Sequence, residues 1–386
     1  MSAPDTSRIP FNKPFMIGPE LDYIRAAVER GHLAGDGPFT QQCREWLERS
    51  FTIPRALLTP SGTAALELAA LLCPLEPGDE VILPSYTFSS TANAFVLRGA
   101  KPVFVDIRED TLNLDERLIE ERIGPRTRVV VPVHYAGVAC DMDRIGAIAE
   151  RHGLVVVEDA AQGVNATYRG RFLGTLGRLG AYSFHETKNV LAGEGGALAL
   201  RDAADIERAE ILREKGTNRA KFFRGEVDKY TWVDVGSSLL PSEIVAAYLC
   251  AQLEHCDEIT AQRLRTWEHY AQALAPLAQQ GHVRLPCVPA ECRHNGHMFY
   301  IILADAAQRD PFLAYLKQCR VQAVFHYVPL HTSPMGQRFG GRAGQLPVTE
   351  DLSERLVRLP CYYGLTRAEQ DRVIETMFEY FRTGAR

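Results

Sequence analysis

Lys188 stands where a lysine could do covalent chemistry. It follows an apolar run at residues 181–184 that predicts a buried strand, and it precedes a glycine-rich turn at residues 193–196. Upstream, the apolar residues 154–157 predict a second strand, which ends near a carboxylate, Asp159. A lysine on a loop and an aspartate at the mouth of a neighbouring strand suit pyridoxal phosphate. The amine binds this cofactor covalently, and the carboxylate keeps the ring nitrogen protonated so that the ring accepts electrons.

Each of these residues alone has a simpler explanation. A lysine near the end of a strand is usually a solvated surface charge. An aspartate after a strand is usually the cap of a loop or helix. Their order in the chain and the residues around them favour the cofactor.

Ser61, Gly62 and Thr63 lie between a predicted strand and a predicted helix. Small residues let backbone N–H groups approach an anion, the hydroxyls can donate, and the start of a helix favours negative charge, so this turn is a candidate phosphate site. An ordinary helix N-cap explains the turn better if it is taken alone. Ser183 offers a further hydroxyl. Phe88 offers a ring that could stack on a planar cofactor, although aromatic residues there more often belong to the core.

Length and composition are those of an ordinary soluble globular protein. The 386 residues suffice for two domains, and the fractions of 46% apolar and 24% charged residues argue against disorder. The net charge of −5 argues against nucleic acid as the main partner. No apolar run reaches the roughly 18 residues of a membrane span, and the first ten residues lack the apolar core of a signal peptide. Nine cysteines favour reduced thiols and a cytoplasmic location.

Cys287, Cys292, His294 and His297 offer four potential zinc ligands. Their spacing differs from that of common zinc modules because the two pairs crowd together. His297 also runs directly into an apolar stretch that predicts a strand. We therefore expect the cluster to be coincidental and expect no metal.

Between residues 55 and 200 the chain alternates apolar runs with helical segments. The runs are rich in Val, Leu and Ile on both faces, as expected for strands that helices cover on both sides. They lie at residues 56–58, 80–83, 102–106, 128–133, 154–157, 181–184 and 197–200, with helices expected at 63–72, 89–97 and 143–152. The pattern predicts a doubly wound α/β domain with a mostly parallel sheet of about seven strands. Ligands in such sheets bind at the carboxyl ends of the strands, near which Asp159 and Ser183 fall.

The last third of the chain changes in pattern. It predicts helices at residues 243–253 and onward to about 277, then a strand, a helix and a strand at 298–303, 311–320 and 324–329. Thr366 and Glu369 have the spacing of a capping box at the start of a final helix. We divide the chain into a large cofactor-binding domain at residues 1–249 and a smaller α+β domain at residues 250–386.

Five motifs occur in order at residues 59–64, 84–88, 158–162, 183–188 and 193–196. Together they resemble the DegT/DnrJ/StrS sugar aminotransferases, within the aspartate-aminotransferase-like, fold type I pyridoxal phosphate enzymes. The resemblance runs from about residue 11 to residue 381. It implies a large seven-stranded domain, a smaller C-terminal domain, and a homodimer with shared active sites.

The resemblance also implies a role for individual residues. Lys188 would bind the cofactor and then carry the proton between cofactor and substrate carbon. Asp159 would pair with the ring nitrogen, Gln162 would hydrogen-bond the ring hydroxyl, and Phe88 would stack on the ring. The phosphate would be bound by Gly62, Thr63 and Ser183, with Ser61 nearby.

Further segments resemble the branch of the family that serves enterobacterial common antigen. They lie at residues 133–140, 215–219, 222–232 and 324–331. That resemblance implies transfer of an amino group from L-glutamate to C4 of dTDP-4-keto-6-deoxy-D-glucose. A run of charges is usually a solvated face, but here aromatic residues interleave with the cations. Candidate contacts to the sugar nucleotide are Lys221, Arg224, Lys229, Tyr230, His326, Tyr327 and His331.

The chain departs from the family at Ser238. Family members commonly carry Gly-Tyr-Asn-Tyr-Arg where residues 236–240 read Gly-Ser-Ser-Leu-Leu. That asparagine reaches across a dimer interface to the neighbouring subunit's cofactor phosphate. Ser238 can still donate one hydrogen bond, but its reach is shorter.

Other activities stay open. A UDP-4-keto-sugar or a dTDP-3-keto-sugar as acceptor fits the same motifs. A pyridoxal-phosphate-dependent sugar dehydratase would carry histidine in place of Lys188, and a sensor without catalysis would have lost Lys188 or Asp159. Both residues are present. A plain binding module of doubly wound type would need no lysine at this position.

Overall fold

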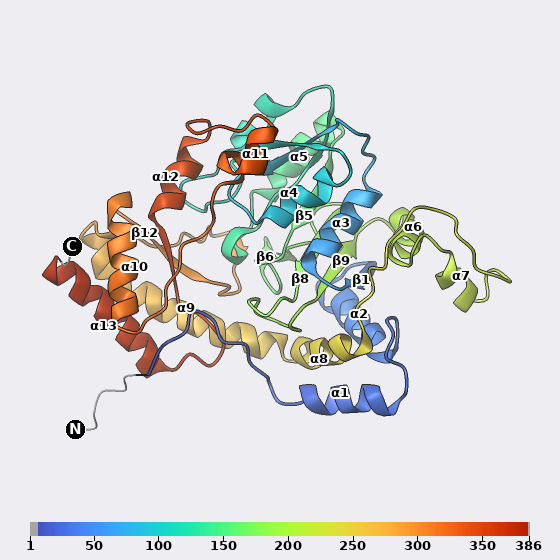
Figure 1. Ribbon diagram of the computed structural model, residues 1–386, viewed down its shortest axis with the longest axis horizontal. Coiled ribbons are helices and arrows are strands. Elements are labelled where there is room, and N and C mark those ends of the chain that lie inside the picture. Colours follow the sequence, from blue (N-terminus) through green and yellow to red (C-terminus); the bar gives the residue numbers. More distant parts are fainter. Residues whose placement is uncertain (1–6, 385–386) are drawn as a thin grey trace.

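A seven-stranded sheet organises the larger part of the molecule (Figure 1). The computed structural model describes residues 7–384, so the first six residues, part of the segment expected to lack a signal peptide, lie outside the described residues. The strands run in the order β1-β9-β8-β5-β4-β2-β3. Their bounds are β1 (Arg55–Thr59), β2 (Glu80–Pro84), β3 (Lys101–Val105), β4 (Thr127–Val130), β5 (Val155–Asp159), β8 (Leu179–Ser183) and β9 (Gly196–Leu200).

The predicted doubly wound sheet is confirmed. Strands β2, β3, β4, β5 and β8 pair in parallel, and β9 is antiparallel to both of its neighbours, β1 and β8. Adjacent residues of a strand enter different cores. Val81 and Leu83 pack into one hydrophobic cluster, and Ile82 between them packs into another. This alternation explains the continuous apolar runs, because helices cover both faces.

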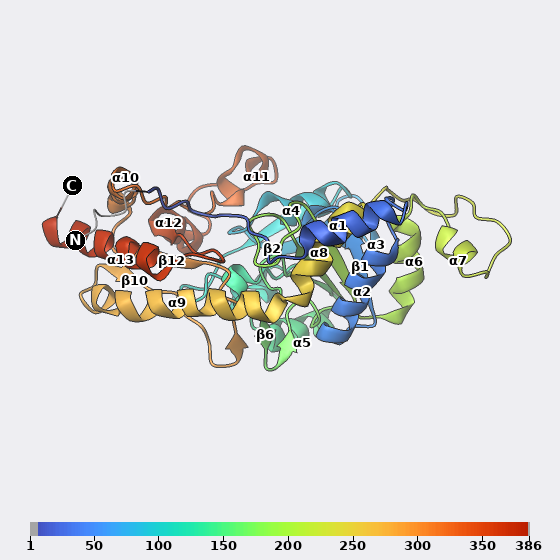
Figure 2. The same cartoon turned by 90° about the horizontal axis from the view of Figure 1, so that it is seen from below.

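The helices of this part come from both halves of the chain (Figure 2). The predicted helices at 63–72, 89–97 and 143–152 are present within one residue at either end. The bounds are α1 (Glu20–Glu29), α2 (Pro38–Phe51), α3 (Gly62–Leu72), α4 (Ser89–Val96), α5 (Met142–His152), α6 (Ala203–Arg213), α7 (Arg219–Phe223) and α8 (Glu243–Glu254). We call the seven-stranded sheet with these helices the large lobe.

A second sheet, β10-β12-β13, forms the small lobe with the helices from α9 to α13. Its bounds are β10 (Val283–Arg284), β12 (Phe299–Leu303), β13 (Leu356–Leu359), α9 (Cys256–Gln279), α10 (Arg309–Gln318), α11 (Pro334–Arg338), α12 (Pro347–Arg355) and α13 (Arg367–Thr383). Helix α13 begins with the predicted capping box of Thr366 and Glu369. The third sheet joins β6 (Thr167–Tyr168), β7 (Arg171–Phe172) and β11 (Cys292–Arg293).

The strand predicted at residues 324–329 is wrong. Val324 forms only an isolated bridge with Arg358, and the third strand of the sheet is β13. The backbone carbonyl of His326 instead accepts a hydrogen bond from the hydroxyl of Tyr86 in the large lobe. Because this carbonyl is bonded to a side chain of the other lobe, it does not pair with a neighbouring strand.

The N-terminal segment belongs to both lobes. Ile9 is fully buried in the core of the small lobe and pairs with Val321. A few residues later, the carbonyl of Phe15 accepts a hydrogen bond from Tyr248 on α8 (2.8 Å). The predicted division after residue 249 falls inside α8 and stays a prediction. No helix within residues 7–384 is long and apolar enough to cross a membrane.

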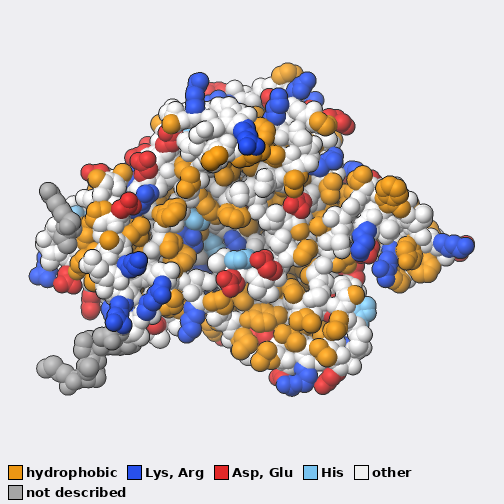
Figure 3. Space-filling view, viewed as in Figure 1, with side chains coloured by type: hydrophobic (Ala, Val, Ile, Leu, Met, Phe, Trp, Pro, Cys, Tyr) orange, Lys and Arg blue, Asp and Glu red, His pale blue; other side chains and the backbone are white. Residues whose placement is uncertain are grey.

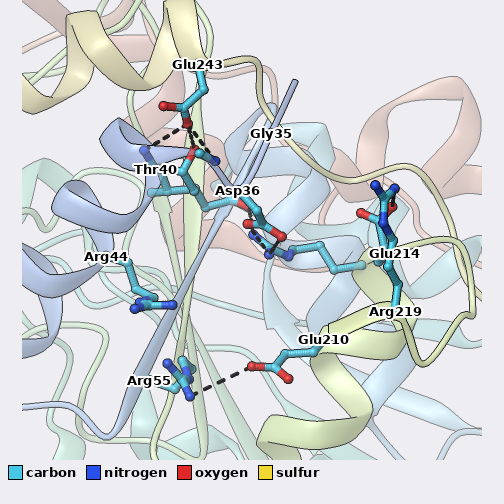
Figure 4. A network of polar contacts seen from close by, with 12 residues as sticks. Gly35, Asp36, Thr40, Arg44, Arg55, Glu210, Glu214, Arg219 and Glu243 are labelled. Atoms are coloured by element: carbon cyan, nitrogen blue, oxygen red, sulfur yellow. Dashed lines mark hydrogen bonds and ion pairs between the residues drawn. The ribbon is translucent and has the colours of Figure 1, made fainter. Parts of the chain in front are cut away.

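A buried carboxylate joins α8 to the start of α2 (Figure 4). Glu243 accepts hydrogen bonds from the backbone N–H groups of Gly37 (3.1 Å), Phe39 (2.7 Å) and Thr40 (3.0 Å). It also accepts one from the Thr40 hydroxyl. These N–H groups are donors that a helix leaves unpaired at its first turn, so a side chain of α8 caps α2.

Glu243→Ala should lower the free energy of unfolding by about 3 kcal/mol, because several buried N–H groups lose their acceptor. Urea denaturation followed by circular dichroism measures it. Glu254→Ala, at the exposed end of the same helix, is the matched control and should cost less than about 1 kcal/mol. Equal losses in the two variants would contradict the capping role.

Candidate active site

Lys188 lies on a closed loop directly after β8. The N–H of Glu186 donates to the carbonyl of Gly193, and that of Lys188 donates to the carbonyl of His185 (both 2.8 Å). The Lys188 ammonium makes no hydrogen bond or ion pair with any residue from 7 to 384. Burial lowers the pKa of Lys188 to about 8, and the charge of Asp159 opposes this shift. The loop therefore presents an amine that loses its proton far more readily than a surface lysine.

Asp159 ends β5 and is buried, with 6% of its surface exposed. One carboxylate oxygen accepts from the hydroxyl of Thr91 (2.7 Å) and the other from the N–H of Ala161 (3.1 Å). The hydroxyl of Thr91 also pairs with that of Thr87 (2.8 Å). Sequence reasoning missed both threonines. Their signal is weak, because serine and threonine at the start of a helix such as α4 are expected as caps.

Gln162 connects the sheet edge to the small lobe. Its side-chain oxygen accepts from the N–H of Ala136 (2.7 Å), and its amide nitrogen donates to the hydroxyl of Tyr327 (3.2 Å). Ala136 has a positive φ of 57°, so the backbone is bent to present this N–H. Gln162 thus lies beside a residue of the small lobe at the mouth of the sheet.

The candidate phosphate turn is tightly backed by two other strands. A Cβ at Gly62 would lie 2.7 Å from the Cβ of Ser183, and a Cβ at Gly196 would lie 2.3 Å from the carbonyl oxygen of Ser61. Only glycine fits at either position. The Ser61 hydroxyl caps α3 by accepting from the N–H of Ala64 (3.1 Å).

The Thr63 hydroxyl pairs with that of Ser90 (2.7 Å). The cap and this pair occupy two hydroxyls of the turn. The first N–H groups of α3 and the hydroxyl of Ser183 stay close together at the same edge. That donor set at a helix start suits a phosphate group.

Aromatic side chains from both lobes gather next to this edge. Phe88 has 60% of its surface exposed, and its ring lies 6.4 Å from that of Tyr327. The rings of His326 and Tyr327 lie 3.4 Å apart. The hydroxyl of Tyr135 lies 2.9 Å from Nδ1 of His326. Burial, then the charges of Arg358 and Lys188, hold the pKa of His326 well below its usual range, so the ring is neutral.

His331 is fully enclosed and fully paired. Its Nδ1 lies 2.7 Å from the hydroxyl of Ser85, and its Nε2 lies 3.0 Å from a carboxylate oxygen of Glu350. In this conformation neither ring nitrogen is free to contact a sugar. The geometry gives His331 a role in joining the end of β2 to the small lobe.

The predicted cations of residues 215–235 lie on a projecting segment. We call residues 215–235 the arm; its helix α7 extends beyond α6 at the edge of the molecule (Figures 1 and 2). Lys221 pairs with Glu207 (2.6 Å), and Arg224 pairs with Glu210 and Glu226 (2.9 and 2.6 Å).

The rest of the arm is more open. Lys229 and Tyr230 are exposed on it, and Ser238 is exposed just beyond its end. In Figures 1 and 2 the arm extends outward from the edge of the large lobe beyond α6.

A buried polar cluster behind Lys188 was also missed. Nδ1 of His297 lies 2.9 Å from the side-chain oxygen of Asn189, whose amide nitrogen donates to the carbonyl of Asn295 (2.8 Å). Asn295 in turn donates to the carbonyl of Gln162 (2.8 Å). The cluster links Asn189, the residue after Lys188, to the backbone of Gln162.

The four potential zinc ligands have other surroundings. The ring of His294 packs against Trp267 (4.4 Å), and Cys287 is exposed. Residues 7–384 contain no group of three or more side chains arranged to hold a metal ion.

Comparison with known proteins places this geometry among aminotransferases. The model of the DegT/DnrJ/EryC1/StrS aminotransferase family matches residues 16–378. The spore coat polysaccharide biosynthesis protein SpsC of Bacillus subtilis (strain 168) is 33% identical over 96% of this chain and 96% of its own length. The GDP-perosamine synthase of Caulobacter vibrioides is 34% identical over 97% of this chain and 98% of its own length.

Two solved aminotransferase structures have a closely similar fold. The aminotransferase TlmJ of Streptoalloteichus hindustanus superposes with a TM-score of 0.89 at 30% identity, covering 98% of this chain and 100% of that one. DesV of S. venezuelae, solved with a ketimine intermediate, superposes with a TM-score of 0.88 at 31% identity, covering 97% and 98%.

In cofactor-free protein, an amine-selective reagent should modify Lys188 at half its maximal rate near pH 8, because only the neutral amine attacks. An unperturbed lysine has its midpoint near about 10.4. Asp159→Asn should move the midpoint lower, since that carboxylate favours the charged form. Peptide mapping after trinitrobenzenesulfonate treatment at a series of pH values measures both. A midpoint above about 10 would contradict the burial of the amine.

Proposed function

The chain belongs to the DegT/DnrJ/EryC1/StrS aminotransferase family, and we propose that it is a pyridoxal-phosphate-dependent sugar aminotransferase. The amino group moves from L-glutamate to C4 of dTDP-4-keto-6-deoxy-D-glucose and gives dTDP-4-amino-4,6-dideoxy-D-galactose. The observation that carries the proposal is the unpaired amine of Lys188, which interacts with the charge of a buried aspartate, Asp159, at the end of β5.

The residues at the sheet edge fit the cofactor. Lys188 would bind it covalently, and Asp159 would pair with the ring nitrogen. The start of α3 and Ser183 would bind the phosphate in the turn where Ser183 leaves no room for a side chain at Gly62. Gln162 would hydrogen-bond the ring hydroxyl, and Phe88 would stack on the ring face. When bound, pyridoxal phosphate supplies an electron sink that lets a proton leave the carbon bearing the amine.

Two features of the chain prepare Lys188 for proton transfer. Its pKa of about 8 lies near neutral pH, where a general acid–base group is most effective. The loop from His185 to Gly193 is closed by backbone hydrogen bonds, so the side chain is anchored at a fixed point. Thr91 and Thr87 hold the Asp159 carboxylate in place, which keeps its negative charge directed at one position.

The acceptor is proposed from the resemblance of residues 133–140, 215–219, 222–232 and 324–331. The name of GDP-perosamine synthase, a relative at 34% identity, supports a nucleotide-linked sugar as the substrate class. His326 and Tyr327 are at hand for the hexose, because both lie beside Gln162 and Phe88. A UDP-4-keto-sugar or a dTDP-3-keto-sugar is the alternative acceptor. A dehydratase or a sensor is disfavoured by the retained Lys188 and Asp159.

We also propose a homodimer with shared active sites. The arm carries exposed aromatic side chains, with 69% of Phe223 and 77% of Trp232 accessible. Leu21 and Val28 on α1 are also more than half exposed, and an apolar patch lies over α1 and α8 in Figure 3. Exposed apolar patches of this kind mark interaction surfaces. An arm directed away from its own lobe suits contact with a second copy, which brings Lys229, Tyr230 and Ser238 to the partner's cofactor.

The purified protein with pyridoxal phosphate, L-glutamate and dTDP-4-keto-6-deoxy-D-glucose should form a C4 amine of galacto configuration, identified by NMR. Lys188→Ala should bind the cofactor through its phosphate and lose turnover, because no other described group is placed to move the proton. The UDP-4-keto and dTDP-3-keto sugars are run in parallel. An amine at C3, or a faster reaction with the UDP sugar, would replace the proposed acceptor.

Hybrid dimers test the shared site. Lys188→Ala subunits should be inactive alone, and Ser238→Asp subunits should be weakly active, because a carboxylate repels the partner's cofactor phosphate. Mixed subunits should regain activity, since one site of a hybrid has both wild-type residues. Activity of the refolded mixture against the sum of the separate variants measures this. Full activity in a monomer by sedimentation would exclude the proposal.

A further inference from the structure

A histidine and a glutamate lie side by side in the core of the large lobe. His134 follows β4, Glu158 lies on β5 directly before Asp159, and both are fully buried. Nε2 of His134 lies 2.8 Å from a carboxylate oxygen of Glu158. The chemistry proposed above uses neither side chain. A buried pair of this kind contributes little to stability by itself, so its presence points to a role in fixing one arrangement of the backbone.

Glu158 is a fixed acceptor. Its two carboxylate oxygens accept hydrogen bonds from three backbone N–H groups, those of Gly174 (2.8 Å), Leu176 and Gly177 (both 2.6 Å). Successive side chains of a strand point to opposite faces. Glu158 and Asp159 therefore leave β5 in opposite directions, and Glu158 serves as an anchor behind the edge that Asp159 occupies.

The hydrogen bonds of His134 fix which ring nitrogen carries the proton. The backbone N–H of Cys140 can only donate, and it lies 3.2 Å from Nδ1, so Nδ1 accepts. Nε2 therefore carries the proton and donates it to Glu158. The imidazole thus bonds to β5 on one side and to Cys140 on the other, which closes residues 134–140 into a loop.

This loop is also bonded to the cofactor edge through its backbone. The N–H of His134 donates to the carbonyl of Asp159 (3.2 Å), and the N–H of Asp159 donates to the carbonyl of Pro132 (2.9 Å). Ala136 lies inside the loop with a φ of 57°, a conformation that residues with a side chain rarely adopt. The bonds of His134 therefore hold a strained turn in place.

The strained turn decides how Gln162 is oriented. The Ala136 N–H donates to the side-chain oxygen of Gln162 (2.7 Å), so the amide nitrogen of Gln162 must lie on the opposite side. This nitrogen has two protons. One is donated to the hydroxyl of Tyr327 (3.2 Å), and the other can serve a further acceptor. Without the Ala136 N–H, the amide could rotate and present its oxygen instead.

We propose that His134 is a positioning residue, whose bond to Glu158 holds the Ala136 N–H against Gln162 so that Gln162 offers a donor to the ring oxygen of the cofactor. The inference rests on the proposed function for the place of the cofactor. A donor at that oxygen favours the form without a proton. His134 touches neither cofactor nor substrate and acts through Gln162.

The absorbance of the bound cofactor, followed against pH in the holoenzyme, reports this proton. His134→Asn keeps an acceptor in the place of Nδ1 and loses the donor to Glu158. It should raise the pH midpoint by about 1 unit, the shift expected when a hydrogen bond to a charged group is lost. His134→Gln keeps a donor in the place of Nε2 and should recover most of the shift.

His152→Asn is the matched control. The ring of His152 also pairs with a glutamate, Glu120 (3.1 Å), but at the exposed end of α5. This variant should leave the pH midpoint unchanged. Thermal unfolding of each variant checks that the fold survives.

A double-variant cycle separates positioning from a general loosening of the fold. Gln162→Ala removes the donor itself and should raise the midpoint by a similar amount. Adding His134→Asn to Gln162→Ala should then change little more, because both act through one hydrogen bond. In cofactor-free protein, the Ala136 amide should exchange its hydrogen at least about 10-fold faster in His134→Asn than in the wild type.

The outcomes separate the inference from the proposed function. An unchanged midpoint with unchanged Ala136 exchange in folded His134→Asn would overturn the inference, as would additive shifts in the double variant. A folded His134→Gln variant with a midpoint as high as that of Gln162→Ala would overturn it by itself. A holoenzyme that binds the cofactor and aminates no keto-sugar would refute the proposed acceptor, and the midpoints would still decide the role of His134.

Discussion

The unpaired amine of Lys188 is the constraint on which the rest of the site depends. A desolvated lysine amine without a hydrogen bond is unfavourable for folding, and the lowered pKa of Lys188 reflects that cost. The surrounding structure compensates with rigidity. The loop is closed by its own backbone hydrogen bonds, and Asn189, directly after the lysine, is held by His297 and Asn295. These hydrogen bonds hold the reactive amine in a position that is unfavourable for the amine itself.

The two lobes contribute different kinds of support. The edge of the large sheet supplies Asp159, which is buried, and Gly62, where a Cβ would clash with Ser183. The small lobe supplies aromatic and basic side chains, Tyr327 and Arg358 among them, on segments that reach toward that edge. Gln162 bonds to Tyr327 across the boundary. The large lobe therefore holds the groups around the Lys188 amine, and the small lobe lines the same edge with aromatic and basic side chains.

The sequence predicts the large lobe well because its strands are buried on both faces, so each is a continuous apolar run such as residues 154–157. The order of motifs around Lys188 likewise indicates the cofactor from the sequence alone. The segment at residues 324–329 is mispredicted because its apolar residues have the period of a strand, while its backbone bonds to Tyr86. Thr91 was missed for a related reason. Its hydroxyl matters because it donates a hydrogen bond to Asp159, which lies far from it in the sequence.

The place of Ile9 in the small lobe has a consequence for how the chain is made. Its N–H donates to the carbonyl of Arg320 (2.9 Å), and its carbonyl accepts from the N–H of Gln322 (3.0 Å). During translation the first residues leave the ribosome long before those partners exist. The seven-stranded sheet is complete by residue 200 and can fold while synthesis continues. The N-terminal segment has to wait, unpaired, for more than three hundred residues to follow it. In that interval the nascent chain exposes the side chain of Ile9, which is later fully buried in the core of the small lobe.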